Sequence, residues 1–162
     1  MSLKSTAKLS PCRRYRYQLE RIWDPDLSVC AFIMLNPSTA DENANDKTIT
    51  KCMKYAKSWG FGGILVVNLF ALRSTDPNKM KTDKDPIGNE ADDYLLEALS
   101  RAQLAVCAWG TDGSHLGRSK QVVDLLRRKG IETFCLKKTK SGEPNHPLYL
   151  SPKILKADLI RL

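Results

Sequence analysis

Three polar side chains stand at positions where they could do chemistry. Asn36 ends a run of apolar residues and is followed by Pro37 and Ser38, Asn68 ends a second such run, and His146 lies between two prolines. An asparagine amide offers a donor beside an acceptor, and an imidazole can donate or accept a proton near neutral pH. The three side chains therefore fit a site that recognises a polar group and moves a proton.

The segment after Asn36 adds carboxylates, among them Asp41 and Asp46, which are candidates for a general base. A structural interpretation stays open, because Asn, Pro, Ser and Asp are also ordinary residues of a capped turn between a strand and a helix. In the same way, His146 could be a histidine of a surface loop. The spacing alone leaves both interpretations in place.

Metal and cofactor chemistry finds no support in the sequence. The five cysteines are odd in number, are scattered and form no CxxC pair, which indicates free thiols in a reducing compartment. We therefore expect no metal site. Because a P-loop and a GxGxxG fingerprint are also missing, nucleoside triphosphates and dinucleotides are disfavoured and we expect no cofactor.

The composition of the chain predicts a folded cytoplasmic protein. Its 162 residues suit one domain spanning residues 1–162, in which residues 1–12 are expected to form a flexible N-terminal segment. No apolar run approaches the length of a membrane span, and the first ten residues lack the apolar core of a signal peptide, so no membrane partner is expected. The net charge of +8 favours a polyanionic partner such as DNA.

The elements that must position these residues alternate along the chain. Imperfect alternation over residues 15–23 predicts a half-exposed strand at an antiparallel edge, forming a hairpin with the buried strand that ends at Asn36. Further strands are expected over residues 63–70, 103–109 and 131–136, separated by amphipathic helices that begin near Asp46, at Asn89 and before Val122. A long polar loop is expected after Pro77.

This order predicts a three-layer α/β/α fold, with a mostly parallel four-stranded sheet and an N-terminal antiparallel edge strand or hairpin. In such sheets, ligands bind outside the carboxyl ends of the strands. We therefore expect Asn36, Asn68, Gly110-Thr111-Asp112 and the segment after the last strand, which contains His146, to lie on one rim.

Several motifs together resemble a known family. They comprise Ile33 to Asp41, Trp59-Gly60, Val67 to Arg73, Ala108 to Gly110 and His146 to Leu150. These segments look like domain-of-unknown-function family 1643, a bacterial and phage family, and they cover nearly the whole chain.

The order of the motifs is also similar to that of the uracil-DNA glycosylase superfamily. The resemblance implies that Asn36 orients a water molecule, that Asn68 reads a base and that His146 donates to the departing base. The family's His-Pro-Ser motif is His-Pro-Leu-Tyr here, with Leu148 as a candidate wedge in duplex DNA. Substrate contacts are further expected from the motif residues Pro37, Ser38, Phe70, Arg73, Trp109 and Gly110.

The sequence thus predicts recognition of a nucleobase or nucleic acid, with cleavage of the N-glycosidic bond of an altered base as the candidate reaction. Two alternatives stay open. One is a non-catalytic module that binds a nucleobase or nucleotide at the same rim. The other is a hydrolase or transferase for another small substrate, which would use Asp46 or Asp112 with His146.

Overall fold

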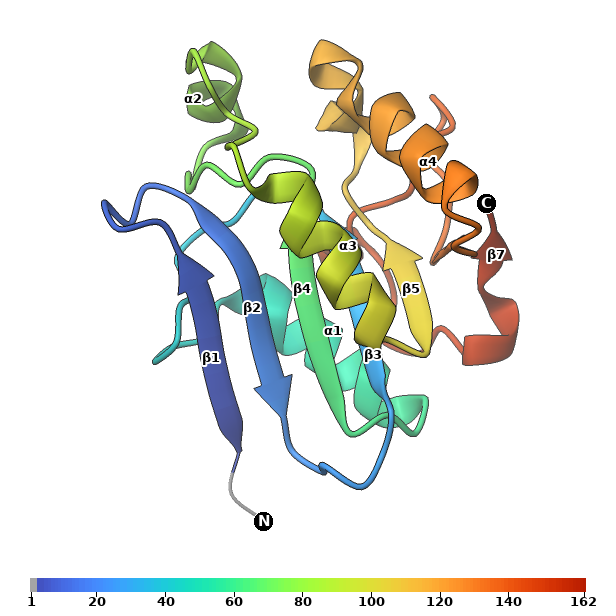
Figure 1. Cartoon of the computed structure of the whole chain (residues 1–162). Coiled ribbons are helices and arrows are strands. Elements are labelled where there is room, and N and C mark those ends of the chain that lie inside the picture. Colours follow the sequence, from blue (N-terminus) through green and yellow to red (C-terminus); the bar gives the residue numbers. More distant parts are fainter. Residues whose placement is uncertain (1–2) are drawn as a thin grey trace.

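The computed structural model describes residues 3–162 and shows an α/β protein built on a mixed sheet of seven strands (Figure 1). The strands are arranged in the order β1-β2-β4-β3-β5-β6-β7. Their bounds are Lys4–Leu9 for β1, Arg16–Ile22 for β2, Val29–Met34 for β3, Gly63–Asn68 for β4, Leu104–Cys107 for β5, Phe134–Cys135 for β6 and Ile160–Arg161 for β7. Strand β3 pairs in parallel with β4 and β5, and β5 pairs in parallel with β6.

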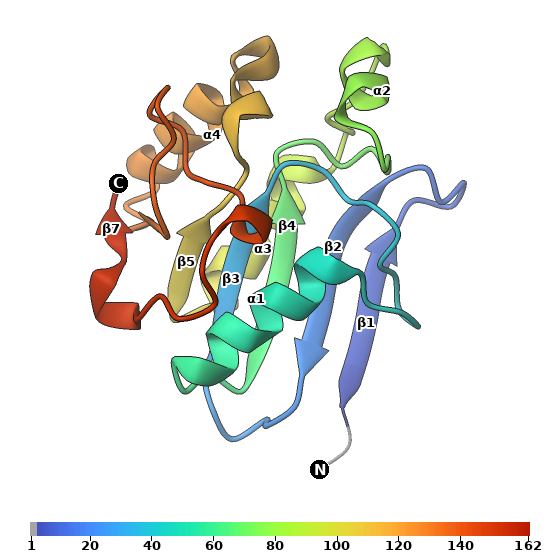
Figure 2. The ribbon, with the colours of Figure 1, turned by 180° about the vertical axis from the view of Figure 1, so that it is seen from behind.

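The central strands are apolar on both faces because helices cover both faces of the sheet. Helix α1 (Lys47–Ser58) lies on one face, and α3 (Ala91–Arg101) and α4 (Arg118–Arg128) lie on the other (Figure 2). Phe32 and Val66 pack on the α1 side, whereas Ile33 and Val67 pack under α3 and α4. This alternation places Asn68, two residues after Val66, on the α1 side of the sheet.

Strand β2 does not occupy the place that its alternation predicts. It lies between β1 and β4 and pairs antiparallel with both, so the expected hairpin with β3 does not form and β1 is the edge strand. Six of its seven residues are buried. The polar residues of β2 give the sequence pattern of a half-exposed strand. In the structure, these side chains are buried and form hydrogen bonds and ion pairs with neighbouring parts of the chain. Glu20, for example, pairs with Lys4 at 2.9 Å and with Arg101 at 2.8 Å.

A register shift in β2 decides the direction of Arg16. Opposite β1, Lys8 pairs with Gln18 and Leu9 pairs with Arg16, so Tyr17 is skipped. Tyr17 stacks on Tyr94 of α3, on the same side as Gln18, whereas Arg16 turns to the α1 side and donates to Ala40 O at 2.9 Å. Such bulges re-aim a side chain that regular alternation would send to the opposite face.

Other boundaries also differ from the expectations. Residues Lys4–Leu9, inside the segment expected to be flexible, form β1, while Met1 and Ser2 lie outside the described residues. The long polar loop contains α2 (Pro77–Thr82), whose N-terminus is capped by Asp76. Helix α3 begins at Ala91 rather than Asn89, and only two residues of the strand expected at 131–136 pair in the sheet.

The C-terminal segment returns to the face that α1 covers (Figure 2). We call residues 147–159 the C-terminal strap. Lys51 and Tyr55 of α1, and Trp59 at its C-terminal cap, are spaced four residues apart and donate to backbone carbonyls of the strap. Lys51 donates to Leu150 O, Tyr55 to Ser151 O at 2.5 Å and Trp59 to Ile154 O at 2.9 Å. Residues four apart share one face of a helix, so this face of α1 holds residues 150–154 of the strap.

Among the described residues, no helix combines the length and the apolar character needed to cross a bilayer.

Candidate functional site

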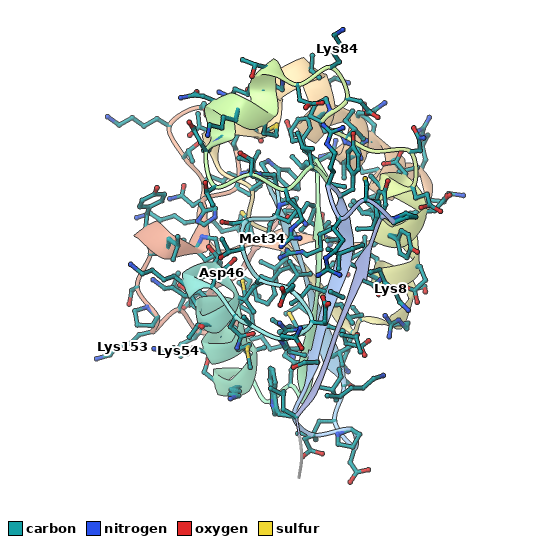
Figure 3. All side chains as sticks on the ribbon, turned by 90° about the vertical axis from the view of Figure 1, so that its left-hand side faces the viewer. Lys8, Met34, Asp46, Lys54, Lys84 and Lys153 are labelled. Atoms are coloured by element: carbon teal, nitrogen blue, oxygen red, sulfur yellow. The ribbon has the colours of Figure 1, made fainter. Side chains whose placement is uncertain are left out.

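A cavity of about 480 Å³ opens at the carboxyl ends of β3, β4 and β5. The first residues of α1, the loop before α2 and the start of the C-terminal strap complete its walls. Its volume is within the usual range for small-ligand sites. Its lining comprises Arg16, Met34, Leu35, Asn36, Ser38, Asp46, Thr48, Ile49, Val66, Asn68, Ser74, Thr75, Pro77, Trp109, Gly110, Thr111, Asp112, His146, Leu148 and Tyr149. In Figure 3, Asp46 marks the end of α1 nearest the cavity, and Lys54 and Lys153 point away into solvent.

Asn68 is the buried polar group of this cavity with the fewest partners. It is the last residue of β4, pairs with Met34 of β3 and is 3% exposed. Neither its Nδ2 nor its Oδ1 has a hydrogen-bond partner among the described residues. A buried donor or acceptor without a partner costs about 1–3 kcal/mol, so the amide is set up for a ligand that supplies both bonds.

Arg16 is the second polar group left incomplete. Its side chain is 2% exposed, its Nη1 donates to Ala40 O, and its Nε has no partner among the described residues. Burial lowers the pKa of Arg16 to about 10, while the negative charge of Asp46 opposes this shift. The guanidinium is therefore still protonated at neutral pH.

Asn36 and Asp46 use part of their hydrogen-bonding capacity to shape the site. Asn36 Nδ2 donates to the carbonyls of Pro37 and Ser74, at 3.1 and 3.0 Å, which leaves its Oδ1 as the atom for a ligand or water. Asp46 caps α1: its Oδ1 accepts from Ile49 N at 2.9 Å, and its Oδ2 accepts from Ala40 N at 3.3 Å. Asp46 is thus first a structural cap, with its carboxylate on the cavity wall.

His146 is held in one orientation by its own chain. Its Nδ1 accepts a hydrogen bond from Leu148 N at 3.3 Å, so Nε2 carries the proton of the neutral ring. Burial lowers the pKa of His146 below its ordinary value, which favours this neutral form. Gly110 lies beside it with a φ of 79°, and a Cβ added there would be 3.5 Å from the Cβ of His146. The positive φ favours glycine at this position, whereas a Cβ there would make only an ordinary van der Waals contact with His146.

Several predicted residues do not share this cavity. Asp41 lies outside the lining, where its Oδ1 accepts from Asn43 N and Ala44 N and organises the loop. Phe70 is fully buried on the α3 and α4 side, because it lies two residues after Asn68 where the chain has left β4. Pro37 is buried and contributes its carbonyl to the bond with Asn36.

Arg73 lies in a neighbouring cleft of about 370 Å³, which shares Ser74 with the cavity. We call this the basic cleft, because four of its seven lining residues are cationic: Arg13, Arg14, Arg73 and Lys79. Two of these cations are paired at the surface, Arg13 with Glu42 at 3.1 Å and Arg14 with Asp83 at 3.0 Å. Part of the chain's positive charge is therefore concentrated next to the cavity.

Trp109 and Leu148 line the cavity in different ways. Trp109 is 1% exposed and donates its Nε1 to Glu143 Oε2 at 2.6 Å, which ties the end of β5 to the loop before His146. Leu148 is 40% exposed at the cavity rim. Trp109 therefore holds the wall in place, whereas Leu148 is free to contact a ligand.

Residues 16–148 match the family described as "Protein of unknown function (DUF1643)". The chain belongs to this family. The matched range contains every cavity-lining residue except Tyr149. No curated protein and no solved structure matches the chain.

The sequence did not predict five polar or aromatic residues that line the cavity: Arg16, Thr48, Ser74, Thr75 and Tyr149. Thr48 could have been found, because the second helical residue after an aspartate cap lies at the mouth of a strand-end site. Arg16 could not, because the register shift that directs it into the cavity has no signature in the alternation of β2. Among residues 3–162, no three His, Cys, Asp or Glu side chains are grouped as a metal ion would require.

Proposed function

We propose that this protein recognises a nucleobase in the cavity at the carboxyl rim, and that Asn68 binds the edge of the base. The observation that carries the proposal is the amide of Asn68, which is buried with both Nδ2 and Oδ1 unpartnered among the described residues. A nucleobase presents an acceptor next to a donor on one edge, which is the complement of an asparagine amide. The base would then satisfy both atoms at once.

Calorimetric titration with free bases and nucleosides tests this proposal. The panel comprises uracil, thymine, cytosine, adenine and guanine, with their 2′-deoxynucleosides. We expect selective binding of one base, weakened roughly 10- to 100-fold by Asn68→Leu, which keeps the size of the side chain but not its hydrogen bonds. Asn43→Ala, an exposed asparagine outside the cavity, is the matched control. If Asn68→Leu binds the base with unchanged affinity, the proposed role of Asn68 is wrong.

The orientation of His146 favours a second step, cleavage of the N-glycosidic bond. In this reaction water attacks C1′ of the sugar, the C1′–N bond breaks and the base leaves with the bonding electron pair. The Nε2–H of neutral His146 would donate to the oxygen on which negative charge develops. Asn36 Oδ1 would accept from the attacking water, in line with the motif order of the uracil-DNA glycosylase superfamily. The proton of the water then passes to solvent or to Asp46, the carboxylate on the cavity wall.

The catalytic step is tested by scoring abasic sites in oligonucleotides that carry uracil, mismatched or alkylated bases, in single and double strands. His146→Ala should lower turnover by roughly 10²-fold while affinity changes little, because its hydrogen bond strengthens only as the base departs. The other histidine, His115, is not part of the lining, and His115→Ala is the control. If His146→Ala weakens binding and no substrate yields abasic sites, the cavity is a binding module without turnover.

The basic cleft supports a nucleic acid as the source of the base. Its cations lie beside the cavity and would contact phosphates of a strand whose base is inserted there. Affinity for an oligonucleotide should then fall steeply with salt, whereas the affinity for a free base should not.

A further inference from the structure

Arg16 is a buried cation that the recognition of a base leaves unused. Among residues 3–162, the only side-chain hydrogen bond of Arg16 joins Nη1 to Ala40 O, and no carboxylate lies within 4.0 Å of its guanidinium nitrogens. A buried charge without a counter-charge is costly, because desolvation is not repaid by a partner. The cavity around Arg16 is thus complementary to an anion.

The nearest acidic group does not complete Arg16. Asp46 exerts the strongest attraction on it, but both oxygens of that carboxylate already accept backbone N–H groups, from Ile49 and Ala40. Arg73 and Arg21 oppose the positive charge of Arg16, whereas Asp41 acts with Asp46 to favour it. Because neither carboxylate bonds to the guanidinium, its free Nε remains available to an anion that enters with a ligand.

Arg16 and Asn68 reach the cavity from adjacent strands. The backbone N–H of Arg16 donates to Ala71 O at 2.9 Å, three residues after Asn68 in the chain, and both side chains line the cavity on the side of α1. The hydroxyls of Ser38, Thr48, Ser74 and Thr75 are in the same lining and can donate to oxyanions. One molecule can therefore occupy both groups.

We infer that the ligand of this cavity is a phosphorylated nucleotide, whose phosphate binds Arg16 while its base binds Asn68. The inference rests on the proposed recognition of a base and specifies in addition that the ligand carries a negatively charged phosphate. A guanidinium can bind two phosphate oxygens in parallel, and the free Nε is one of the donors of that fork. A neutral nucleoside would leave it empty.

Two sources can provide the phosphate, and an oligonucleotide arm separates them. A free nucleoside monophosphate occupies the cavity alone, whereas a nucleotide within a strand also places its neighbouring phosphates on the basic cleft. For a strand, Arg14→Met should weaken the binding of a short single-stranded oligonucleotide several-fold and leave a monophosphate unaffected. For a free nucleotide, Arg14→Met should change neither affinity. Both results support the phosphate site at Arg16.

The deciding experiment compares each 2′-deoxynucleoside with its 5′-monophosphate by calorimetry, first on the unaltered protein. We expect the preferred monophosphate to bind about 10- to 100-fold more tightly than its nucleoside. Arg16→Met should remove this difference, and Arg16→Lys, which keeps the charge but not the fork, should restore part of it. Arg128→Met, which removes one exposed cation from the end of α4, should leave the difference intact.

Equal affinities of nucleoside and monophosphate for the unaltered protein overturn the inference, even if Arg16→Met fails to fold. So does a preference for phosphate that persists in a folded Arg16→Met variant. Inorganic pyrophosphate separates this failure from that of base recognition. If no base binds, but pyrophosphate binds to the unaltered protein and to Asn68→Leu and not to Arg16→Met, the anion site stands and base recognition falls. If pyrophosphate also fails to bind, both fall.

Discussion

Two buried arginines of this protein, Arg118 and Arg16, are equally hidden from solvent but differ in their partners. Arg118 is 1% exposed, and all three of its nitrogens donate: Nε to Leu69 O at 2.7 Å, Nη1 to Gln121 Oε1 at 2.9 Å and Nη2 to Asp92 Oδ1 at 2.5 Å. Arg16 is 2% exposed and has one protein partner. The fold thus supplies partners for every side-chain nitrogen of Arg118, but not for all of those of Arg16.

The difference separates scaffold from site. Arg118 joins the chain after β4 to α3 and α4, on the face opposite the cavity, and leaves no donor for a ligand. Arg16 begins β2, the strand next to β4, and it faces the cavity with a free Nε. Natural proteins hold such unsatisfied groups mainly where a ligand completes them, at some loss of stability without the ligand.

The largest expected effect comes from removing the paired arginine. Arg118→Met should lower the free energy of unfolding by about 2–4 kcal/mol, because it leaves Leu69 O and the Asp92 carboxylate without their partner. The matched variant Arg16→Met should stay within about 1 kcal/mol of the unaltered protein, since it removes a desolvated charge with few bonds. Urea denaturation without ligand measures both. A larger loss at Arg16 would show that the fold, and not a ligand, requires its charge.

The two strand-end asparagines extend the comparison at a smaller scale. Asn36→Leu should destabilise the protein by about 1–3 kcal/mol, because the carbonyls of Pro37 and Ser74 lose their donor. Asn68→Leu should instead stabilise it by about 1 kcal/mol, since it replaces an unpartnered amide with an apolar side chain of similar size. Thermal unfolding of the two variants side by side gives the sign of each change. A loss at position 68 equal to that at 36 would contradict the free state of its amide.

The smallest expected effect is the pH dependence that His146 contributes. Because burial holds its pKa below 6.5, the unfolded chain binds more protons than the folded one just below that pH, and stability falls as the pH falls from about 7 through this window. His146→Asn keeps an acceptor for Leu148 N but does not titrate. Between pH 7.5 and 5.5, the unfolding free energy of this variant should therefore fall less than that of the unaltered protein. The difference between the two falls should be at most about 1 kcal/mol. Parallel curves for the two proteins would mean that His146 does not titrate as a buried group.

The strand-end rule was enough to predict which parts of the chain meet at the cavity. Asn36, Asn68, Gly110 and His146 end or follow strands of the parallel part of the sheet, and the carboxyl ends of parallel strands share one edge. The cap at Asp46 was also readable, because an aspartate before a helical period is a strong start signal.

The residues that sequence reasoning misplaced depend on long-range contacts. In β2, polar residues predicted an edge strand, but Gln18 and Glu20 are buried against Glu97 and Arg101 of α3, about eighty residues later in the chain. Regular alternation would also have sent Arg16 to that side. Asp41 was misplaced for a similar reason, since Arg21 binds the carbonyls of the loop around it and fixes its path.

The attachment of the C-terminal strap to α1 has a consequence for the thermodynamics of binding. His146, Leu148 and Tyr149 lie at or next to the start of a segment that Lys51, Tyr55 and Trp59 hold by three backbone carbonyls. The conformational entropy of this wall is therefore lost when the chain folds, before any ligand arrives. A ligand meets a preorganised surface, and almost all of the ordering penalty on association is its own.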